Sequence, residues 1–142
     1  MSLRVDLFQF LRGIAKQEKA GISWGFSDDK KPYPRIVLRL TGDSLEHHTR
    51  GACDFSTANV QITAYAEKEQ TRSAHRVAES IARAIAVKLD GYHGPMEGTF
   101  CHSAELTERY QVEEQLAGKG GWLFGMVLEF TITHGVSVQA TT

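Results

Sequence analysis

The chain has 142 residues, with 16 lysine and arginine residues against 17 aspartate and glutamate residues, a formal net charge of −1. This length suits one domain with a single core, and the near-neutral charge provides no general attraction for a nucleic acid backbone, which argues against a nucleic-acid-binding module. No stretch approaches the ~18 apolar residues of a membrane span, and the N-terminus does not resemble a secretion signal, so we expect a cytoplasmic protein.

The first half of the chain predicts one helix and a strand pair. Leu3, Leu7, Phe10, Leu11 and Ile14 recur at helical spacing, which favours a helix over residues 2–19 that Gly21 ends. Ile22, Trp24 and Phe26 alternate like a short strand. Residues 35–41 and 58–65 also alternate and predict an antiparallel pair. The residues between them, 42–57, have no clear periodicity and are interpreted as a long loop and a candidate site.

The second half predicts another helix and two strands. Apolar residues at helical spacing favour a helix over 71–89, with Thr71 as its cap and Gly91 at its end. Phe100, His102, Ala104 and Leu106 predict a strand, residues 107–121 a loop, and residues 122–134 a final strand. The expected fold is α+β, in the order α-β-β-α-β-β: an antiparallel or mixed sheet of about four strands with two helices on one face. One domain should span 1–142, ordered over about 3–134, with 135–142 as a flexible tail.

Chemical motifs are weak throughout the chain. His47 and His48 lack the spacing of metal ligands, and we interpret them as ordinary loop histidines. His102 and His134 fall on apolar strand faces and predict partly buried imidazoles. Cys53 and Cys101 match no metal or disulfide pattern, and the glycines at 118–121 precede a strand rather than a helix, unlike a phosphate loop. We therefore expect no catalytic residue, no bound cofactor and no metal.

Taken in order, the segments resemble one protein family. They are residues 34–40 (PRIVLRL), residues 60–66 (VQITAYA), the helix over 74–89 followed by DGYHG at 90–94, and residues 122–132 (WLFGMVLEFTI). Together they resemble the tail-completion or tail-terminator proteins of long-tailed bacteriophages and prophages, over roughly residues 7–134. The resemblance implies a small non-enzymatic α+β protein. Such proteins form a ring, usually a hexamer, that caps the growing tail tube and helps to join it to the head.

The resemblance also implies partners and surfaces. The partners would be further copies of the chain, the tail tube protein and the head-completion proteins, with DNA passing through the ring, in the host cytoplasm during assembly and then in the virion tail. A ring needs two different contact patches on each subunit, and the outer sheet face could supply one through Val37, Tyr65, Leu123 and Val127. The two long loops could contact neighbouring proteins through Asp43, Glu46, His47, Arg50, Asp54, Glu113 and Glu114.

A rival interpretation comes from another class of protein. The same pattern of elements also fits a small-ligand-binding or enzymatic α+β domain that dimerises through its sheet. That function would need a pocket in which polar groups converge, and the sequence indicates no such group.

Overall fold

The computed structural model describes residues 3–18, 20–24, 34–47, 53–67, 74–96, 99–115 and 122–136. These residues form two helices and six strands in the order α-β-β-β-α-β-β-β. In chain order they are α1 (Leu3–Gln17), β1 (Gly21–Trp24), β2 (Arg35–His47), β3 (Cys53–Glu67), α2 (Ala74–Leu89), β4 (Gly94–Met96), β5 (Thr99–Gln115) and β6 (Trp122–Val136).

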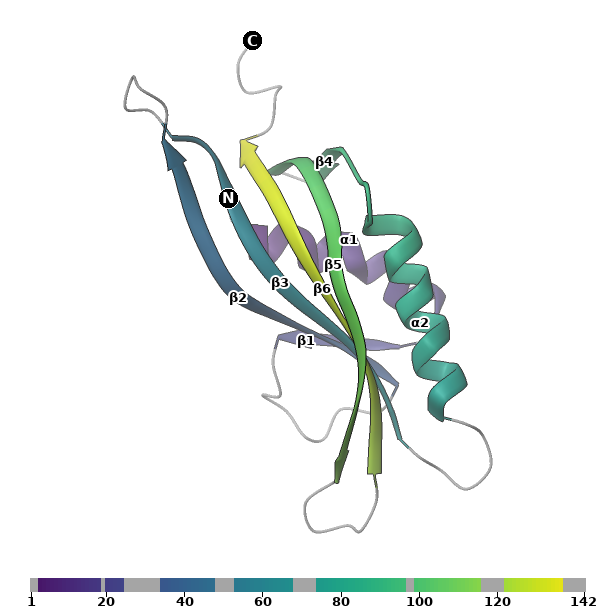
Figure 1. Cartoon of the computed structure of the whole chain (residues 1–142). Helices are drawn as coiled ribbons and strands as arrows, with labels where there is room; N and C mark the ends of the chain where they lie inside the picture. Colours follow the sequence, from purple (N-terminus) through teal and green to yellow (C-terminus); the bar gives the residue numbers. More distant parts are fainter. Residues whose placement is uncertain are drawn as a thin grey trace.

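All six strands belong to one curved sheet with the order β1-β2-β3-β6-β5-β4 (Figure 1). The pair β1–β2 is parallel and the other pairs are antiparallel, so the sheet is mixed. The α+β class and the antiparallel pairing of β2 with β3 are confirmed. The expected count of about four strands was too low, because the short strands β1 and β4 add to the two edges.

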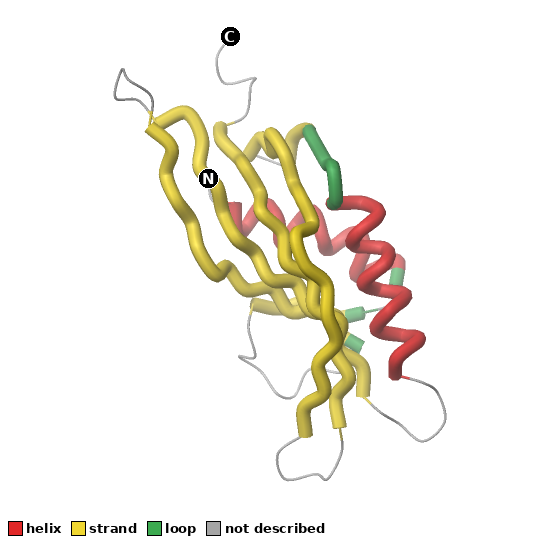
Figure 2. Tube along the Cα trace, in the orientation of Figure 1, coloured by secondary structure: helices red, strands yellow, loops and turns green. Residues whose placement is uncertain are grey.

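Both helices lie on the same side of the sheet, as predicted (Figure 2). The helix α2 packs on β3 and β6, and α1 packs against α2, against β1 and β2 at one edge of the sheet and against β4 at the other. Buried residues at helical spacing face the sheet from each helix, and the opposing strands contribute alternate residues. The largest fully buried members of this core are Leu7, Leu11, Ile36, Leu38, Ile62, Ile81, Ile85, Leu89, Phe124, Leu128 and Phe130.

The predicted ends of the two helices are confirmed only in part. At the end of α2, Gly91 has a φ of 82°, and its N–H donates to the carbonyl of Ala104 at 2.7 Å, so its predicted role is confirmed. In contrast, α1 ends at Gln17, and Gly21 already belongs to β1, where its N–H bonds the carbonyl of Pro34. Thr71, predicted as a cap, lies outside the described residues.

The two predicted long loops are instead mostly strand. β2 continues to His47 and β3 begins at Cys53, with pairs that run to His47↔Cys53, so most of residues 42–57 form a hairpin. Similarly, β5 continues to Gln115, so the start of the segment 107–121 pairs with β6. The prediction failed because polar residues interrupt the apolar alternation of the sequence in these stretches, whereas pairing through backbone hydrogen bonds needs no hydrophobic period.

One strand face was also assigned wrongly. The register of β5 shifts between Cys101 and Ser103, which places Cys101 and Ala104 in the core and leaves His102 exposed. Such a bulge adds one residue to a strand and therefore reverses the alternation beyond it. His102 is not the partly buried imidazole that strict alternation predicted, whereas His134 is half-buried on β6.

Candidate functional site

The predicted partner-binding residues lie at opposite ends of the sheet. Asp43, Glu46, His47 and Asp54 belong to the β2–β3 hairpin, whereas Glu113 and Glu114 belong to β5 near the β5–β6 hairpin. Figure 1 shows the two hairpins pointing away from each other. Arg50 lies outside the described residues. The structure therefore separates the predicted contact residues into two groups, one at each end of the molecule.

The four residues predicted as a subunit interface share the sheet face away from the helices. Val37, Tyr65 and Leu123 form a second buried cluster there, with Val112 packed against it, and Val127 pairs in register with Thr63 on the same face. Each of the four predicted residues is only 3–5% exposed within the single chain. Their first role is therefore to pack this face of the sheet, and their part in a subunit contact stays a prediction.

Gly125 makes this second cluster possible, and the sequence analysis did not single it out. It pairs with Tyr65 on β3 and with Val112 on β5. A Cβ atom at position 125 would lie 2.9 Å from Tyr65 Cε1 and 2.9 Å from Val112 Cγ2, closer than real carbon atoms approach. A glycine within a strand often marks such a close approach, so the available signal was the lone glycine in the alternating segment 122–134.

The sheet face that carries the second cluster also carries a small polar network of Gln61, Tyr110 and Glu129. The Tyr110 hydroxyl donates to Glu129 Oε2 at 2.7 Å, and Gln61 Nε2 lies 3.4 Å from both partners. The hydrogen bond to Glu129 raises the pKa of Tyr110 above its ordinary value, with burial and the nearby carboxylates adding to the effect. The network links three neighbouring strands through side chains and offers a polar, half-buried surface.

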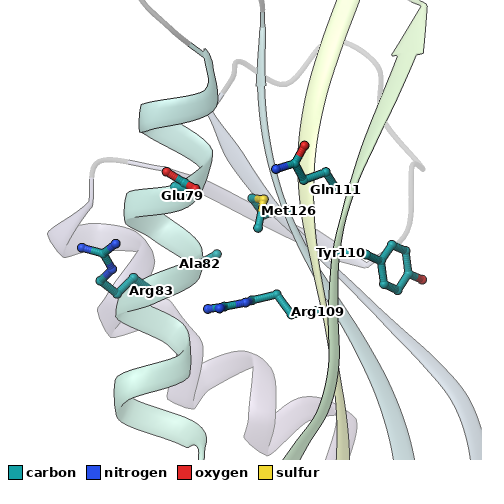
Figure 3. Close-up of a pocket in the computed structure, with 7 residues that line it drawn as sticks. All are labelled: Glu79, Ala82, Arg83, Arg109, Tyr110, Gln111 and Met126. Carbon is teal, nitrogen blue, oxygen red and sulfur yellow. The ribbon is translucent and has the colours of Figure 1, made fainter.

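A groove separates α2 from β5 (Figure 3). It has a volume of about 410 Å³ and is lined by Glu79, Ala82, Arg83, Arg109, Tyr110, Gln111 and Met126. The side chains of Arg109 and Gln111 point toward α2, whereas the ring of Tyr110 points to the other side of the sheet. Small-molecule pockets of this size are mostly apolar, whereas this groove has only Ala82 and Met126 as apolar lining.

Among the described residues, no group of three or more His, Cys, Asp or Glu side chains could hold a metal ion. Burial raises the pKa of the Cys101 thiol to about 11, although a hydrogen bond involving the backbone of Ser103 opposes the shift, so this cysteine is a poor nucleophile. Within the same ranges, no helix is long and apolar enough to cross a membrane.

No protein-family model and no curated protein sequence matches this chain. Among solved structures, its fold is similar to that of a chain from an assembly described as "Virion of native gene transfer agent (GTA) particle". The TM-score is 0.54 at 12% sequence identity, and the match covers 93% of this chain and 95% of that chain. At this identity the likeness is one of fold, and it extends over nearly the full length of both chains.

Proposed function

We propose that this protein is a structural, non-enzymatic component of a phage-like virion, and that it acts as a ring-forming tail terminator. The observation that carries the proposal is the fold likeness to a chain of a gene transfer agent virion over 93% of this chain. The resemblance of residues 34–40, 60–66 and 122–132 to tail-completion proteins narrows the proposal from virion component to terminator.

The arrangement of the two hairpins supports a ring with two distinct sides. A tail terminator must contact the tube on one side and the head-completion proteins on the other. The β2–β3 hairpin carries Asp43, Glu46, His47 and Asp54 at one end of the sheet, and β5 carries Glu113 and Glu114 at the other. Polar hairpins on a rigid sheet are suited to such recognition. We propose that each end contacts one class of partner, while DNA passes through the ring.

We keep one set of residues as candidates that support the subunit contact: Val37, Tyr65, Leu123 and Val127. Because these side chains are buried within one chain, we expect them to support that contact by keeping the sheet curved. An aspartate at Val127 should then destabilise the subunit itself, since an unpaired carboxylate would be buried there.

Deletion of the gene tests the function directly. Particles made without the protein should have tails of abnormal length or tails that fail to join heads in electron micrographs, and the intact gene supplied in trans should restore them. Purified particles should contain the protein by mass spectrometry. Normal, head-joined tails in the deletion strain would contradict the terminator role, and absence from the particles would contradict the broader structural role.

The groove between α2 and β5 favours one rival, a small-ligand-binding or enzymatic α+β domain. Its volume is in the range of ligand pockets, and Arg109 and Gln111 point toward α2 across it. Its lining is largely polar, and within the described residues it includes no histidine, cysteine or serine that could act as a nucleophile. If deletion of the gene abolishes virion assembly while the Arg109→Ala variant still assembles normal virions, the terminator is favoured over this rival.

A further inference from the structure

The sheet has two open edges within the described residues. β1 covers the outer edge of β2 only from Arg35 to Leu38. At the opposite edge of the sheet, β4 covers the outer edge of β5 only from Thr99 to Cys101. Beyond these short strands, no described strand pairs with the outer side of β2 or β5.

The chain that connects α2 to β4 covers a little more of the β5 edge. The N–H of Gly91 donates to the carbonyl of Ala104, and Leu106 donates its N–H to Asp90 Oδ1 at 3.0 Å. Among the described strands, none pairs with the outer edge of β5 over residues 107–115 or with the outer edge of β2 over residues 39–47, and we call these stretches the open parts of β5 and β2. An edge strand presents a row of N–H and C=O groups that can pair with another chain.

From these two edges we infer that neighbouring subunits join by continuing the sheet, with residues 39–47 of β2 in one copy paired antiparallel to residues 107–115 of β5 in the next. This inference rests on the self-assembling ring of the proposed function. The strand directions agree with it: β2, β3, β6 and β5 alternate in direction, so a second copy placed alongside in the same orientation presents β5 antiparallel to β2.

A second copy of the chain is the occupant that satisfies both edges at once. The two open stretches differ from each other, so their contact is heterologous, and a heterologous contact that closes into a ring leaves no edge exposed. A single bound peptide would cover one edge and leave the other open. Pairing of β2 with β2, or of β5 with β5, would give a two-fold dimer instead and is a distinct outcome of the test below.

The offset between the two stretches also fits a closed ring. Gln111, at the middle of the open part of β5, pairs with Met126 of β6, which pairs with Ala64 of β3. Asp43, at the middle of the open part of β2, pairs with Ala58 of β3. The step from Ala58 to Ala64 is about 20 Å along the strand, and four strands span roughly 19 Å across the sheet. Joining the open stretches therefore tilts the strands by roughly 45° from the ring axis, close to the tilt of about 35–45° in closed barrels.

Cross-linking with paired cysteines tests this contact in the full-length chain. Thr41→Cys lies near the middle of the open β2 edge and Gln111→Cys at the middle of the open β5 edge, and both native side chains are exposed. The two native cysteines should not react with the cross-linker, because Cys53 is replaced by serine in every variant and Cys101 is buried. The reagent is a bismaleimide that spans a cross-strand pair. The matched control, Val87→Cys, is on the exposed side of α2, where the native residue is 79% exposed.

We expect a mixture of the Thr41→Cys and Gln111→Cys proteins to form covalent dimers, while each protein alone stays monomeric under denaturing electrophoresis. A chain with both cysteines should give a ladder that stops at the ring size, in solution and in purified particles. Dimers from either single variant alone, or no more dimer from the mixture than from Thr41→Cys with Val87→Cys, would overturn the inference. Absence of the protein from particles would instead overturn the proposed function, whatever the cross-linking shows.

Discussion

A methyl group added at Gly125 should destabilise the domain, because this glycine lies between two side chains from different strands. The new Cβ atom of Gly125→Ala would lie 2.9 Å from Tyr65 Cε1 on one side and 2.9 Å from Val112 Cγ2 on the other. Neither neighbour can retreat freely, because Tyr65 is buried and Val112 packs against the same cluster. The methyl group therefore cannot be accommodated by the movement of one flexible side chain.

The expected loss is about 1–3 kcal/mol in the free energy of unfolding, the usual cost of an extra methyl group in a packed core. Replacement of glycine by alanine within a strand would otherwise be favourable, by roughly 0.5–1 kcal/mol. Gly13→Ala is the matched control. Gly13 lies within α1 and a Cβ atom there would meet nothing within 4 Å, so the same substitution should stabilise the domain by about 0.5–1 kcal/mol.

Urea denaturation of both variants at low protein concentration measures the two changes with assembly minimised. Val112→Ala removes Cγ2, one of the three atoms that the new methyl group would meet, so the double variant Gly125→Ala/Val112→Ala should be more stable than additivity predicts, by about 0.5 kcal/mol or more. A Gly125→Ala protein as stable as the unmodified chain would refute the close packing of Tyr65 and Val112 over this strand. Strict additivity in the double variant would locate the clash elsewhere.

Three further outcomes are expected. Phe124→Ala should cost about 3–5 kcal/mol in urea denaturation because its side chain is fully buried in the core, whereas Thr131→Ala, which loses one exposed hydrogen bond, should cost less than about 1 kcal/mol. An ultraviolet titration of tyrosinate, taken as the difference between the unmodified protein and Tyr110→Phe, should give a raised pKa for Tyr110, and this pKa should fall in Glu129→Gln. Because folding favours the protonated phenol, its stabilising effect is present below the unfolded pKa and is lost as the pH rises through the folded pKa. With the other cysteine replaced by serine, a thiol reagent at a pH of about 8 should find only about one Cys101 thiol in a thousand ionised, so labelling should require denaturant, and rapid labelling of the native protein would contradict its burial.

The parts of the fold that could be predicted are those in which one face is apolar. The alternation in residues 122–134 correctly placed Phe124, Leu128 and Phe130 in the core, and the helical spacing in residues 74–89 located α2. In both elements the burial of one face imposes a period on the sequence, and the period can be read without a structure. The same reasoning placed Val37 and Tyr65 together on the second face of the sheet, because alternate residues of a strand lie on opposite faces.

The parts that could not be predicted are those in which the sequence shows no sustained apolar alternation or in which the register shifts. The ends of β2, β3 and β5 continue beyond the helices, and a strand that is held by backbone pairs needs no apolar period. The register shift between Cys101 and Ser103 reversed one strand face without any glycine or proline to mark it. The burial of Leu123 and Val127 within a single chain also escaped prediction, since alternation shows that residues share a face but does not show what covers that face.

These unpredicted strand ends bear on the class of function. A two-stranded hairpin alone is marginally stable in water, so strand ends that extend past the helices gain stability from further strand pairing. The chemistry of a small enzyme requires a pocket on the scaffold and does not by itself call for such extensions at both ends of the sheet. A ring subunit does have a use for them, because each open edge can pair with a neighbour and each hairpin end can contact the next layer of an assembly. In the proposed ring, pairing with neighbours would stabilise the strand ends that the single chain leaves half-paired, and for this reason we favour a virion component over a free-standing ligand-binding domain.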